Sequence, residues 1–287
     1  MSDVSPVVST DWLASRLGMR GLKVVDASWY LPGSGRDPSA EYLAGHIPGA
    51  LFFDLDAISD RTSPLPHMLP GAAEFAGRMA GLGLSDTDQI VVYDDSGVNL
   101  SAPRAWWTFR TFGHEQVSVL DGGLGKWRRE QRQLEMGTVI LPAGTFTARM
   151  NRAAVRDLAA VRNNIRDGTE QLVDMRSSGR FAGVEPEPRP GLRVGHVPGS
   201  LNLPFTELVR SDGTILSPEE LRSKLARSGV DLTRPVIATC GSGTSACSLI
   251  LSLYSIGYTR TALYDGAWAE WGGRSDAPVE SQPPPRS

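Results

Sequence analysis

The sequence predicts an α/β protein built from two tandem copies of one domain, each a mostly parallel sheet flanked by helices on both faces. Two observations predict this class. Short apolar runs typical of buried strands alternate with helical segments, and motifs of the first half recur in the same order in the second. The length of 287 residues is also more than one hydrophobic core usually serves, which agrees with two domains.

The duplication is visible in three pairs of segments. These are Leu22–Asp26 with Gln171–Asp174, Gly45–Ala50 with Gly195–Ser200, and Asp121–Trp127 with Asp265–Trp271. A constant order with small changes in spacing is what two copies of one domain produce. We therefore expect domains over 1–132 and 152–287. The stretch 133–151 is poorly periodic and contains Pro142 and Gly144, so we interpret it as a linker.

Individual elements follow from local patterns. Strands are expected at Ile90–Tyr93, Val117–Leu120, Leu172–Asp174, Ser200–Leu203, Val236–Thr239 and Thr261–Tyr264, each a short apolar or β-branched run. Helical segments are expected at Ser101–Phe112 and Ala246–Ser255. Ser217 and Glu220 form the pattern of a capping box that opens a further helix. Alternating strands and helices require crossover connections, which give parallel sheets covered on both faces.

Composition narrows the function. The chain is 40% hydrophobic and 21% charged with a net charge of -3, which is typical of a soluble globular enzyme. Its 29 basic and 32 acidic residues leave no positive field for a nucleic acid. The N-terminal segment lacks the apolar core of a signal peptide, and no apolar run reaches the ~18 residues of a membrane span. We expect a cytoplasmic protein without a nucleic-acid or membrane partner.

Metal chemistry also has little support. The two cysteines are Cys240 and Cys247, and the four histidines are His46, His67, His114 and His196. Two cysteines cannot form a dense disulfide framework, so both are expected to be free thiols. None of the histidines has a second His or Cys at the spacing of metal ligands. We expect neither a metal site nor an organic cofactor.

Cys240 stands where parallel sheets carry their active sites, directly after the expected strand Val236–Thr239. A loop of small residues follows it, and then the helical run Ala246–Ser255 begins. Loop amides and the helix dipole there would favour a thiolate. A cysteine at a strand end is more often a small buried residue, but two glycines and two hydroxyl residues within five positions favour a nucleophile. Cys247, among apolar helix residues, is expected to pack in the core.

Seven motifs in order then give the chain a family resemblance. They are His46–Ala50, Ser101–Trp107, Asp121–Gly123, Gly179–Phe181, Glu185–Arg189, His196–Gly199 and the Cys240 loop. With these the sequence resembles the tandem-domain sulfurtransferases of the rhodanese superfamily, and most of all the 3-mercaptopyruvate sulfurtransferases. The resemblance implies two rhodanese-like domains, of which only the second carries the reactive cysteine. The corresponding strand end of the first copy, Val91–Gly97, contains no thiol.

The resemblance also implies a substrate site. Gly241, Ser242, Gly243, Thr244 and Ser245 would form the cradle around the transferred sulfur. Thiosulfate enzymes tend to have Arg and Lys after the cysteine, whereas this loop contains no cation. It departs from the usual mercaptopyruvate pattern by Thr244-Ser245 in place of Val-Thr. Arg180 and Arg189 match the family's substrate-binding arginines, which suit a carboxylate; the alternative is that both are solvated loop residues.

A proton relay is a further implication. His46, with Asp37 nine positions earlier and Ser242 in the loop, resembles a relay proposed for the family. The alternative is a structural role, because the Gly-His-(Ile/Val)-Pro-Gly turn of His46 recurs around His196. A hydrogen bond shared by both turns would explain both histidines.

The expected activity is transfer of sulfur from 3-mercaptopyruvate to a thiol or cyanide through a Cys240 persulfide, with release of pyruvate. Thioredoxin is one candidate thiol acceptor. Thiosulfate as the main donor is the alternative within the enzyme class, and a persulfide carrier without turnover is the alternative outside it. A cysteine phosphatase is disfavoured, because that chemistry needs Arg six positions after the cysteine, where Ala246 stands.

Overall fold

The chain folds into two compact units. The computed structural model describes residues 4–31 and 33–281, so the predicted domain ends at 1–3 and 282–287 lie outside the described residues. The first unit comprises the chain up to 62, residues 69–152 and residues 209–215. The second comprises 63–68, 153–208 and the chain from 216 onward. Residues 133–151, which the sequence suggests as a linker, are thus counted with the first unit.

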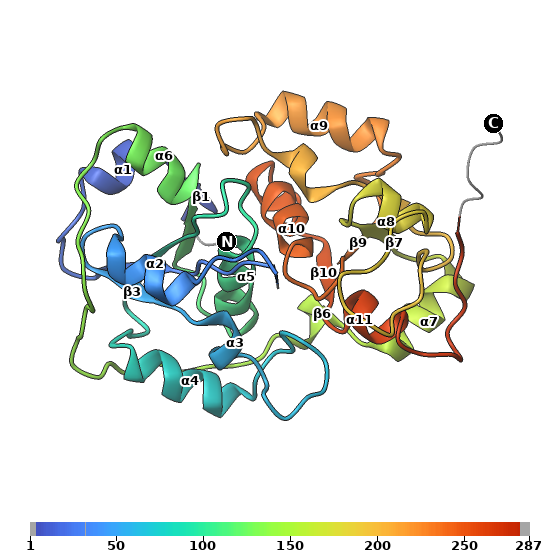
Figure 1. Cartoon of the computed structure of the whole chain (residues 1–287), viewed down its shortest axis with the longest axis horizontal. Coiled ribbons are helices and arrows are strands. Elements are labelled where there is room, and N and C mark those ends of the chain that lie inside the picture. The colour runs from blue at the N-terminus through green and yellow to red at the C-terminus, as the bar shows by residue number, and fades with distance from the viewer. Residues whose placement is uncertain (1–3, 32, 282–287) are drawn as a thin grey trace. The chain divides into compact units, whose positions relative to one another are not determined.

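The elements alternate along both units (Figure 1). The first unit contains β1 (Val7–Val8), α1 (Thr10–Ala14), β2 (Leu22–Asp26), α2 (Pro38–Ala44), β3 (Ala50–Phe52), α3 (Leu55–Ile58), α4 (Ala72–Gly81), β4 (Gln89–Tyr93), α5 (Ala102–Thr111), β5 (Val117–Leu120) and α6 (Gly123–Arg129). From the short 3-10 helix η1 (Arg152–Ala154) the chain continues into β6 (Val155–Arg156), α7 (Leu158–Asp167), β7 (Gln171–Asp174), α8 (Ser178–Ala182), β8 (Leu201–Asn202), η2 (Phe205–Leu208), α9 (Pro218–Arg227), β9 (Val236–Thr239), α10 (Ala246–Ser255), β10 (Thr261–Tyr264) and α11 (Ala267–Trp271).

Both sheets have five strands and the same order, β1-β5-β4-β2-β3 in the first unit and β6-β10-β9-β7-β8 in the second. Every strand pair in them is parallel. Identical topology in two units of one chain is what a duplicated domain gives, so the structure confirms the predicted fold class. In both sheets the central strand is the equivalent one, β4 in the first unit and β9 in the second.

Helices cover both faces of each sheet. In the first unit Val91 and Tyr93 of β4 pack in one cluster with Leu124 and Trp127 of α6. Side chains alternate along a strand, so the intervening Val92 faces the other side, where α5 contacts β4 and β5. In the second unit α10 contacts β9 and β10 in the same way.

Most element predictions are confirmed. The bounds of β5, β9, β10 and α10 are those predicted, β4 and β7 begin one residue earlier, and β8 is shorter than expected. The capping box is present, because the Ser217 hydroxyl accepts from the Glu220 amide and the Glu220 carboxylate accepts from the Ser217 amide. The stretch 133–151 packs against the first unit, where Phe146 meets the rings of Phe75 and Phe109 edge-on.

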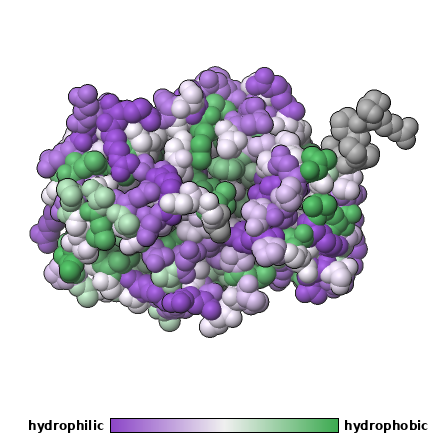
Figure 2. All heavy atoms as spheres, in the orientation of Figure 1, coloured by the Kyte–Doolittle hydropathy of each residue, from purple (hydrophilic) through white to green (hydrophobic). Residues whose placement is uncertain are grey.

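The surface seen in the orientation of Figure 1 combines hydrophilic and hydrophobic residues. Figure 2 shows hydrophilic residues over much of that face, with separate hydrophobic areas between them. Within residues 4–31 and 33–281, no helix combines the length and the apolar character needed to span a membrane.

Both copies have a buried aspartate at the end of an equivalent strand, but its partners differ between the copies. Asp174, at the end of β7, forms an ion pair with Arg176, whose Nη2 lies 2.6 Å from Asp174 Oδ2. The equivalent Asp26, at the end of β2, accepts instead from the amide of Ser28 at 2.9 Å. Desolvation raises the pKa of Asp26 to about 6, although hydrogen bonds from Ser28 and Tyr93 oppose the shift. The first unit therefore holds a carboxylate that ionises at a higher pH than an exposed one.

Asp26→Asn should change how stability depends on pH. Between about pH 4 and pH 6 the folded chain keeps the Asp26 proton while the unfolded chain has lost it, so wild-type stability falls as the pH rises. The raised pKa corresponds to a loss of about 3 kcal/mol that the variant does not suffer. Denaturant unfolding from pH 3.5 to 7 should show that the free energy of unfolding of the variant rises relative to that of the wild type as the pH rises. A pH-independent difference would contradict this reading.

Asp94, directly after β4, uses its carboxylate to bind the start of α5. It accepts from the backbone amides of Ser101 at 2.9 Å and Ala102 at 2.8 Å, and from the amide and hydroxyl of Ser96. Ser101 itself makes no side-chain capping bond to α5. A buried carboxylate thus supplies acceptors for amides that the helix cannot satisfy internally.

Asp94→Ala should destabilise the first unit by more than about 2 kcal/mol, because buried amides lose a charged acceptor. Asp95→Ala is the matched control. Asp95 pairs with Arg36 and Arg128, whose side chains are 38% and 39% exposed, so its loss should cost less than about 1 kcal/mol. Denaturant unfolding monitored by circular dichroism compares the two. Equal losses would mean that the Asp94 bonds are not a main source of stability.

Candidate functional site

Cys240 lies at the carboxyl end of the central strand β9, where the chain turns toward α10. Its carbonyl accepts from the Trp268 amide at 2.9 Å, which fixes the strand end against the start of α11. The residue is 2% exposed. Cys247 lies in α10 and is fully buried, with its thiol donating to the Gly243 carbonyl at 3.4 Å. Cys247 thus packs in the core as predicted, and the nucleophilic role of Cys240 stays a prediction.

The first copy shows what the position of Cys240 can do. Asp94 follows β4 as Cys240 follows β9, and the Asp94 carbonyl accepts from the Leu124 amide at 3.0 Å, as the Cys240 carbonyl does from Trp268. The Asp94 carboxylate reaches the first amides of α5. At the equivalent start of α10, Ser245 makes no side-chain capping bond. Cys240 therefore stands at the strand end at which the first copy places a carboxylate.

Hydroxyl groups of the Cys240 loop contact a histidine. His67 Nδ1 lies 3.1 Å from Ser242 Oγ and 2.9 Å from Thr244 Oγ1, and all three residues are buried. His67 belongs to the segment 63–68, which is counted with the second unit although it lies early in the chain. Its φ of 59° is in the left-handed region, which a non-glycine residue rarely adopts. The surroundings thus hold the ring of His67 on these two hydroxyls.

Sequence reasoning missed His67. It lies 175 positions from Ser242, and its neighbours Pro64, Pro66 and Pro70 indicate only an irregular segment. Nothing in its spacing connects it with the cysteine. Only the tertiary fold brings it to the loop.

Arg180 belongs to α8, and its side chain lies against the same loop. A Cβ built on Gly241 would be 2.9 Å from Arg180 Nη2, so the guanidinium packs directly on the residue that follows Cys240. The side chain is 20% exposed, which leaves part of it accessible. Of the two predicted substrate-binding arginines, Arg180 is thus beside the cysteine loop. Arg189 is half-buried in the segment between α8 and β8.

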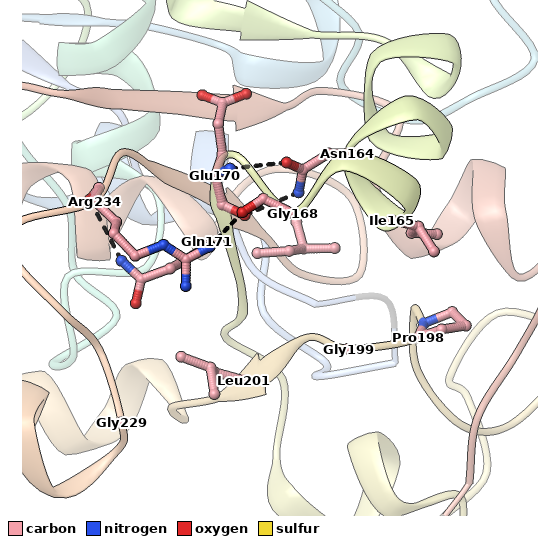
Figure 3. Close-up of a pocket in the computed structure, with 11 residues that line it drawn as sticks. Asn164, Ile165, Gly168, Glu170, Gln171, Pro198, Gly199, Leu201, Gly229 and Arg234 are labelled. Atoms are coloured by element: carbon pink, nitrogen blue, oxygen red, sulfur yellow. Dashed lines mark hydrogen bonds between the residues drawn. The ribbon is translucent and has the colours of Figure 1, made fainter.

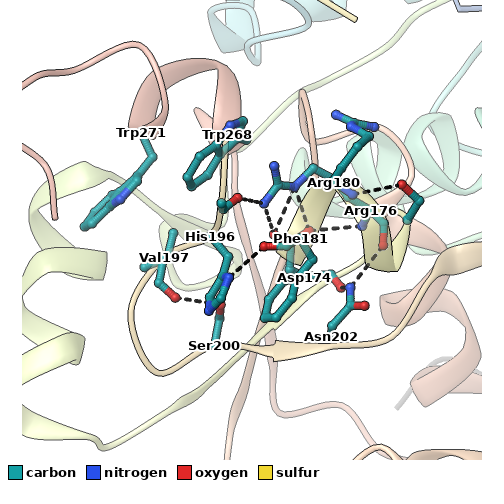
Figure 4. A network of polar contacts seen from close by, with 12 residues as sticks. Asp174, Arg176, Arg180, Phe181, His196, Val197, Ser200, Asn202, Trp268 and Trp271 are labelled. Atoms are coloured by element: carbon teal, nitrogen blue, oxygen red, sulfur yellow. Dashed lines mark hydrogen bonds and ion pairs between the residues drawn. The ribbon is translucent and has the colours of Figure 1, made fainter. Parts of the chain in front are cut away.

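Arg180 lies next to a polar network built around Asp174 and Arg176 (Figure 4), and Glu187 joins it to this network. Glu187 accepts from Arg180 Nη2 at 2.5 Å and from Arg176 Nη1 at 2.6 Å, and its side chain is 2% exposed. Arg176 also binds Asp174 and donates to the Gly195 carbonyl at 2.8 Å. Desolvation works against the charge of Arg176, but Asp174 and Glu187 together raise its pKa. Glu187 carries no signal in the sequence beyond its place in the motif Glu185–Arg189.

His46 and His196 have matching surroundings in the two copies. His46 Nδ1 is 2.8 Å from the Tyr42 carbonyl and its ring stacks on Tyr42, while His196 Nδ1 is 2.7 Å from the Phe181 carbonyl and its ring stacks on Phe181. His46 also pairs through its backbone with Glu135, as His196 does with Glu280. These shared contacts support the structural alternative for His46.

Asp37 contacts its own helix. It is the N-cap of α2, where its carboxylate accepts from the amides of Ser39 and Ala40 at 3.0 Å. Asp37 and His46 both belong to the first unit, whereas Ser242 belongs to the second and has His67 as a partner. The relay of His46, Asp37 and Ser242 therefore stays a prediction, and the geometry offers His67 as a different partner for Ser242.

A cavity of about 290 Å³ lies elsewhere in the second unit (Figure 3). Its lining includes Gln171 at the start of β7, Gly199 before β8 and Arg234 before β9, so it opens at the amino ends of the strands. Gln171 Nε2 donates to carbonyls of Asp231 and Arg234, and Arg234 donates to the Gly168 carbonyl. Cys240 is at the opposite edge of the sheet. Across the described residues, no group of three or more His, Cys, Asp or Glu side chains is arranged to hold a metal ion.

Comparisons with known proteins agree with this arrangement. The 3-mercaptopyruvate sulfurtransferase of Escherichia coli K12 is 47% identical over 95% of this chain and 97% of its own length. Thiosulfate/3-mercaptopyruvate sulfurtransferase 1, a mitochondrial protein of Arabidopsis thaliana, is 44% identical over 98% of this chain and 79% of its own length. The crystal structure of SseA from Escherichia coli, described as a 3-mercaptopyruvate sulfotransferase with the rhodanese fold, superposes with a TM-score of 0.85 at 44% identity and covers 92% of this chain and 99% of its own.

The family model "Rhodanese-like domain" matches twice, over residues 9–130 and 157–274. These ranges contain the two parallel sheets, and the second contains Cys240, Arg180 and Glu187. The matches span most of both copies. With two matches that together cover most of its length, the chain belongs to the rhodanese family as a protein of two rhodanese-like domains.

Proposed function

We propose that this chain is a 3-mercaptopyruvate sulfurtransferase, which moves the sulfur of 3-mercaptopyruvate to a thiol or cyanide through a Cys240 persulfide and releases pyruvate. The observation that carries the proposal is the position of Cys240. Its thiol occupies the strand end at which the first copy binds a carboxylate to helix amides, and Arg180 lies against the next residue. In this proposal the helix amides face the Cys240 thiolate, and Arg180 faces the anionic donor.

In the first half-reaction the Cys240 thiolate attacks the sulfur of 3-mercaptopyruvate. A sulfur–sulfur bond forms, the carbon–sulfur bond breaks, and its electron pair goes to the carbon, which leaves as the enolate of pyruvate. The enolate takes up a proton and becomes pyruvate. Arg180 and Arg189 are the groups suited to the carboxylate and carbonyl of the donor, because a guanidinium forms paired hydrogen bonds with a carboxylate.

In the second half-reaction an acceptor thiolate or cyanide attacks the outer sulfur of the persulfide. The sulfur–sulfur bond breaks and returns its electron pair to Cys240, which regenerates the thiolate. The cradle of Gly241, Ser242, Gly243, Thr244 and Ser245 surrounds this sulfur in the proposal. Thioredoxin is a candidate acceptor by its chemistry, and a cytoplasmic location stays part of the proposal.

His67 and Ser242 are the groups we assign to the proton. The Ser242 hydroxyl lies in the Cys240 loop, and His67 Nδ1 at 3.1 Å can exchange a proton with it. Protonation of the enolate needs a donor at the site, and an imidazole can pass a proton to a neighbouring hydroxyl. The sequence suggested His46 with Asp37 for this task. The contact between the Ser242 hydroxyl and His67 Nδ1 favours His67 for this task.

Thiosulfate as the main donor is the alternative. The name of the Arabidopsis relative includes both donors, so family membership alone leaves the choice open. The loop after Cys240 favours mercaptopyruvate, because Gly241 and Ser242 provide dipoles without a formal charge for a dianion. A persulfide carrier without turnover is the second alternative. It would have the same loop and differ only in releasing no pyruvate.

Initial rates with 3-mercaptopyruvate and with thiosulfate on one preparation test the proposal. We expect kcat/KM for mercaptopyruvate to exceed that for thiosulfate by at least about tenfold, the worth of one charged contact. Exposure to donor should add one sulfur atom to the peptide that contains Cys240, by mass spectrometry. Cys240→Ser should abolish the adduct and turnover, while Cys247→Ser, the matched control, should keep both.

Three outcomes would count against this function. Turnover by Cys240→Ser would remove the persulfide mechanism. An adduct without pyruvate release would favour the carrier. Equal efficiency with both donors would remove the argument from the loop while leaving the Cys240 persulfide intact.

His67→Asn separates the two histidines. Asn tolerates a positive φ and can keep a hydrogen bond to Ser242, but it cannot pass on a proton as an imidazole does. We expect kcat with mercaptopyruvate to fall by roughly 10²-fold, because the proton donor beside Ser242 is lost. His46→Asn is the control and should lower stability while kcat stays close to that of the wild type. The reverse pattern would restore the relay through His46.

A further inference from the structure

We propose that Glu187 is a positioning residue, which holds Arg180 against the Cys240 loop and by its charge disfavours dianionic sulfur donors. The inference rests on the proposed function and goes beyond it, because it identifies a residue outside the loop that sets donor choice. Three observations carry it: how Glu187 binds Arg180, how the rest of the network fixes Glu187, and the charge of the whole cluster.

The first observation is the geometry of the pair. Glu187 accepts from Arg180 Nη2 at 2.5 Å and from Nε at 3.3 Å, so one edge of the guanidinium faces the carboxylate. Nη2 also lies against Gly241, at 2.9 Å from where a Cβ would stand. A planar guanidinium held along one edge presents its remaining N–H groups in a fixed direction. Glu187 thus determines which donors of Arg180 are left for a substrate.

The second observation is that Glu187 itself cannot move easily. Its Oε1 also binds Arg176 Nη1 at 2.6 Å, and Arg176 has a fully buried side chain. Arg176 is fixed in turn by Asp174, by the Gly195 carbonyl and by the ring of Trp268, whose centroid is 4.3 Å from its Cζ. The carboxylate of Glu187 therefore has the rigid support that precise placement of a binding group requires.

The third observation is charge. Asp174 and Glu187 carry two negative charges and Arg176 and Arg180 carry two positive charges, so the cluster has no net charge. Glu187 lies within 2.5 Å of Arg180 and is almost fully buried, so solvent screens its charge weakly. A donor near Arg180 also experiences the negative charge of Glu187. A dianion experiences this repulsion about twice as strongly as a monoanion.

The cluster therefore favours a donor with a single carboxylate over thiosulfate. Mercaptopyruvate needs the directed N–H groups of Arg180 for its carboxylate and carbonyl. Thiosulfate depends more on positive charge, and Glu187 offsets the charge of Arg180. The same residue thus supplies direction and reduces charge, and both effects act on the ratio of the two donors.

The test compares Glu187→Gln with the wild type, by kcat/KM for both donors. Gln keeps the length of Glu and an acceptor oxygen, but removes the charge. The ratio of mercaptopyruvate to thiosulfate efficiency should fall about threefold or more, the size of one partly screened charge interaction. Added salt should reduce this shift. Glu187→Asp keeps the charge but shortens the side chain, so it should lower efficiency with mercaptopyruvate more than with thiosulfate.

Glu185→Gln is the matched control. Glu185 lies in the same segment and binds the Ser177 hydroxyl at 2.7 Å, but it is exposed. Its neutralisation changes the net charge equally and should leave the donor ratio unchanged. An Arg180→Gln background provides the second control, because there Glu187→Gln should no longer shift the ratio. Glu187→Asn repeats the charge change if the glutamine variant does not fold.

Two results would overturn the inference: the same donor ratio in Glu187→Gln and Glu185→Gln, or an undiminished shift in the Arg180→Gln background. Failure of the proposed function looks different. In that case the wild type itself would not turn over mercaptopyruvate, whatever residue stands at 187.

Discussion

The amides at the start of a helix that follows a central strand need an acceptor, and the two copies of the domain differ in the residue that stands where this acceptor can lie. In the first copy the chain supplies the acceptor itself, because the Asp94 carboxylate binds the amides of Ser101 and Ala102. In the second copy the equivalent residue is Cys240, and Ser245 adds no side-chain cap to α10. The same position thus closes the turn in one copy, and in the other it carries the thiol that we propose as the sulfur carrier. At this turn Asp94 of the first copy stands where the second copy has Cys240.

A second divergence reinforces the first. Asp26 and Asp174 occupy equivalent strand ends, but only Asp174 has an arginine beside it. Arg176 allows the second copy to bury two carboxylates, Asp174 and Glu187, and Glu187 then reaches Arg180. The first copy, with Ser28 in the place of Arg176, leaves Asp26 with a raised pKa and builds no such network. The placement of Arg180 therefore depends on charges that are compensated below the surface.

The fold was predictable from the sequence because its signals are local and repeated. Apolar runs such as Val236–Thr239 and Thr261–Tyr264 have the bounds of the observed strands, and the capping box of Ser217 and Glu220 marks the start of α9. The repeated order of motifs predicts two equivalent units, and the common strand order confirms it. The position of Cys240 between a strand and a helix was readable for the same reason. Strand, loop and helix are adjacent in the chain, so their local order places the cysteine at the carboxyl edge of the sheet.

The partners of the cysteine loop were decided by the tertiary structure. His67 lies 175 residues before Ser242, in an irregular segment without helical or strand periodicity, so no spacing rule could connect the two. The sequence instead favoured His46, whose repeated turn is conspicuous, and the fold gives that histidine the same backbone contacts as His196. Glu187 is a similar case, because an exposed and a buried glutamate look alike in a segment rich in Pro and Glu. By itself the sequence determined the fold, the duplication and the position of the thiol, which depend on local periodicity. Only packing, which brings distant segments together and excludes water from their charges, decided which histidine meets Ser242 and which carboxylate holds Arg180.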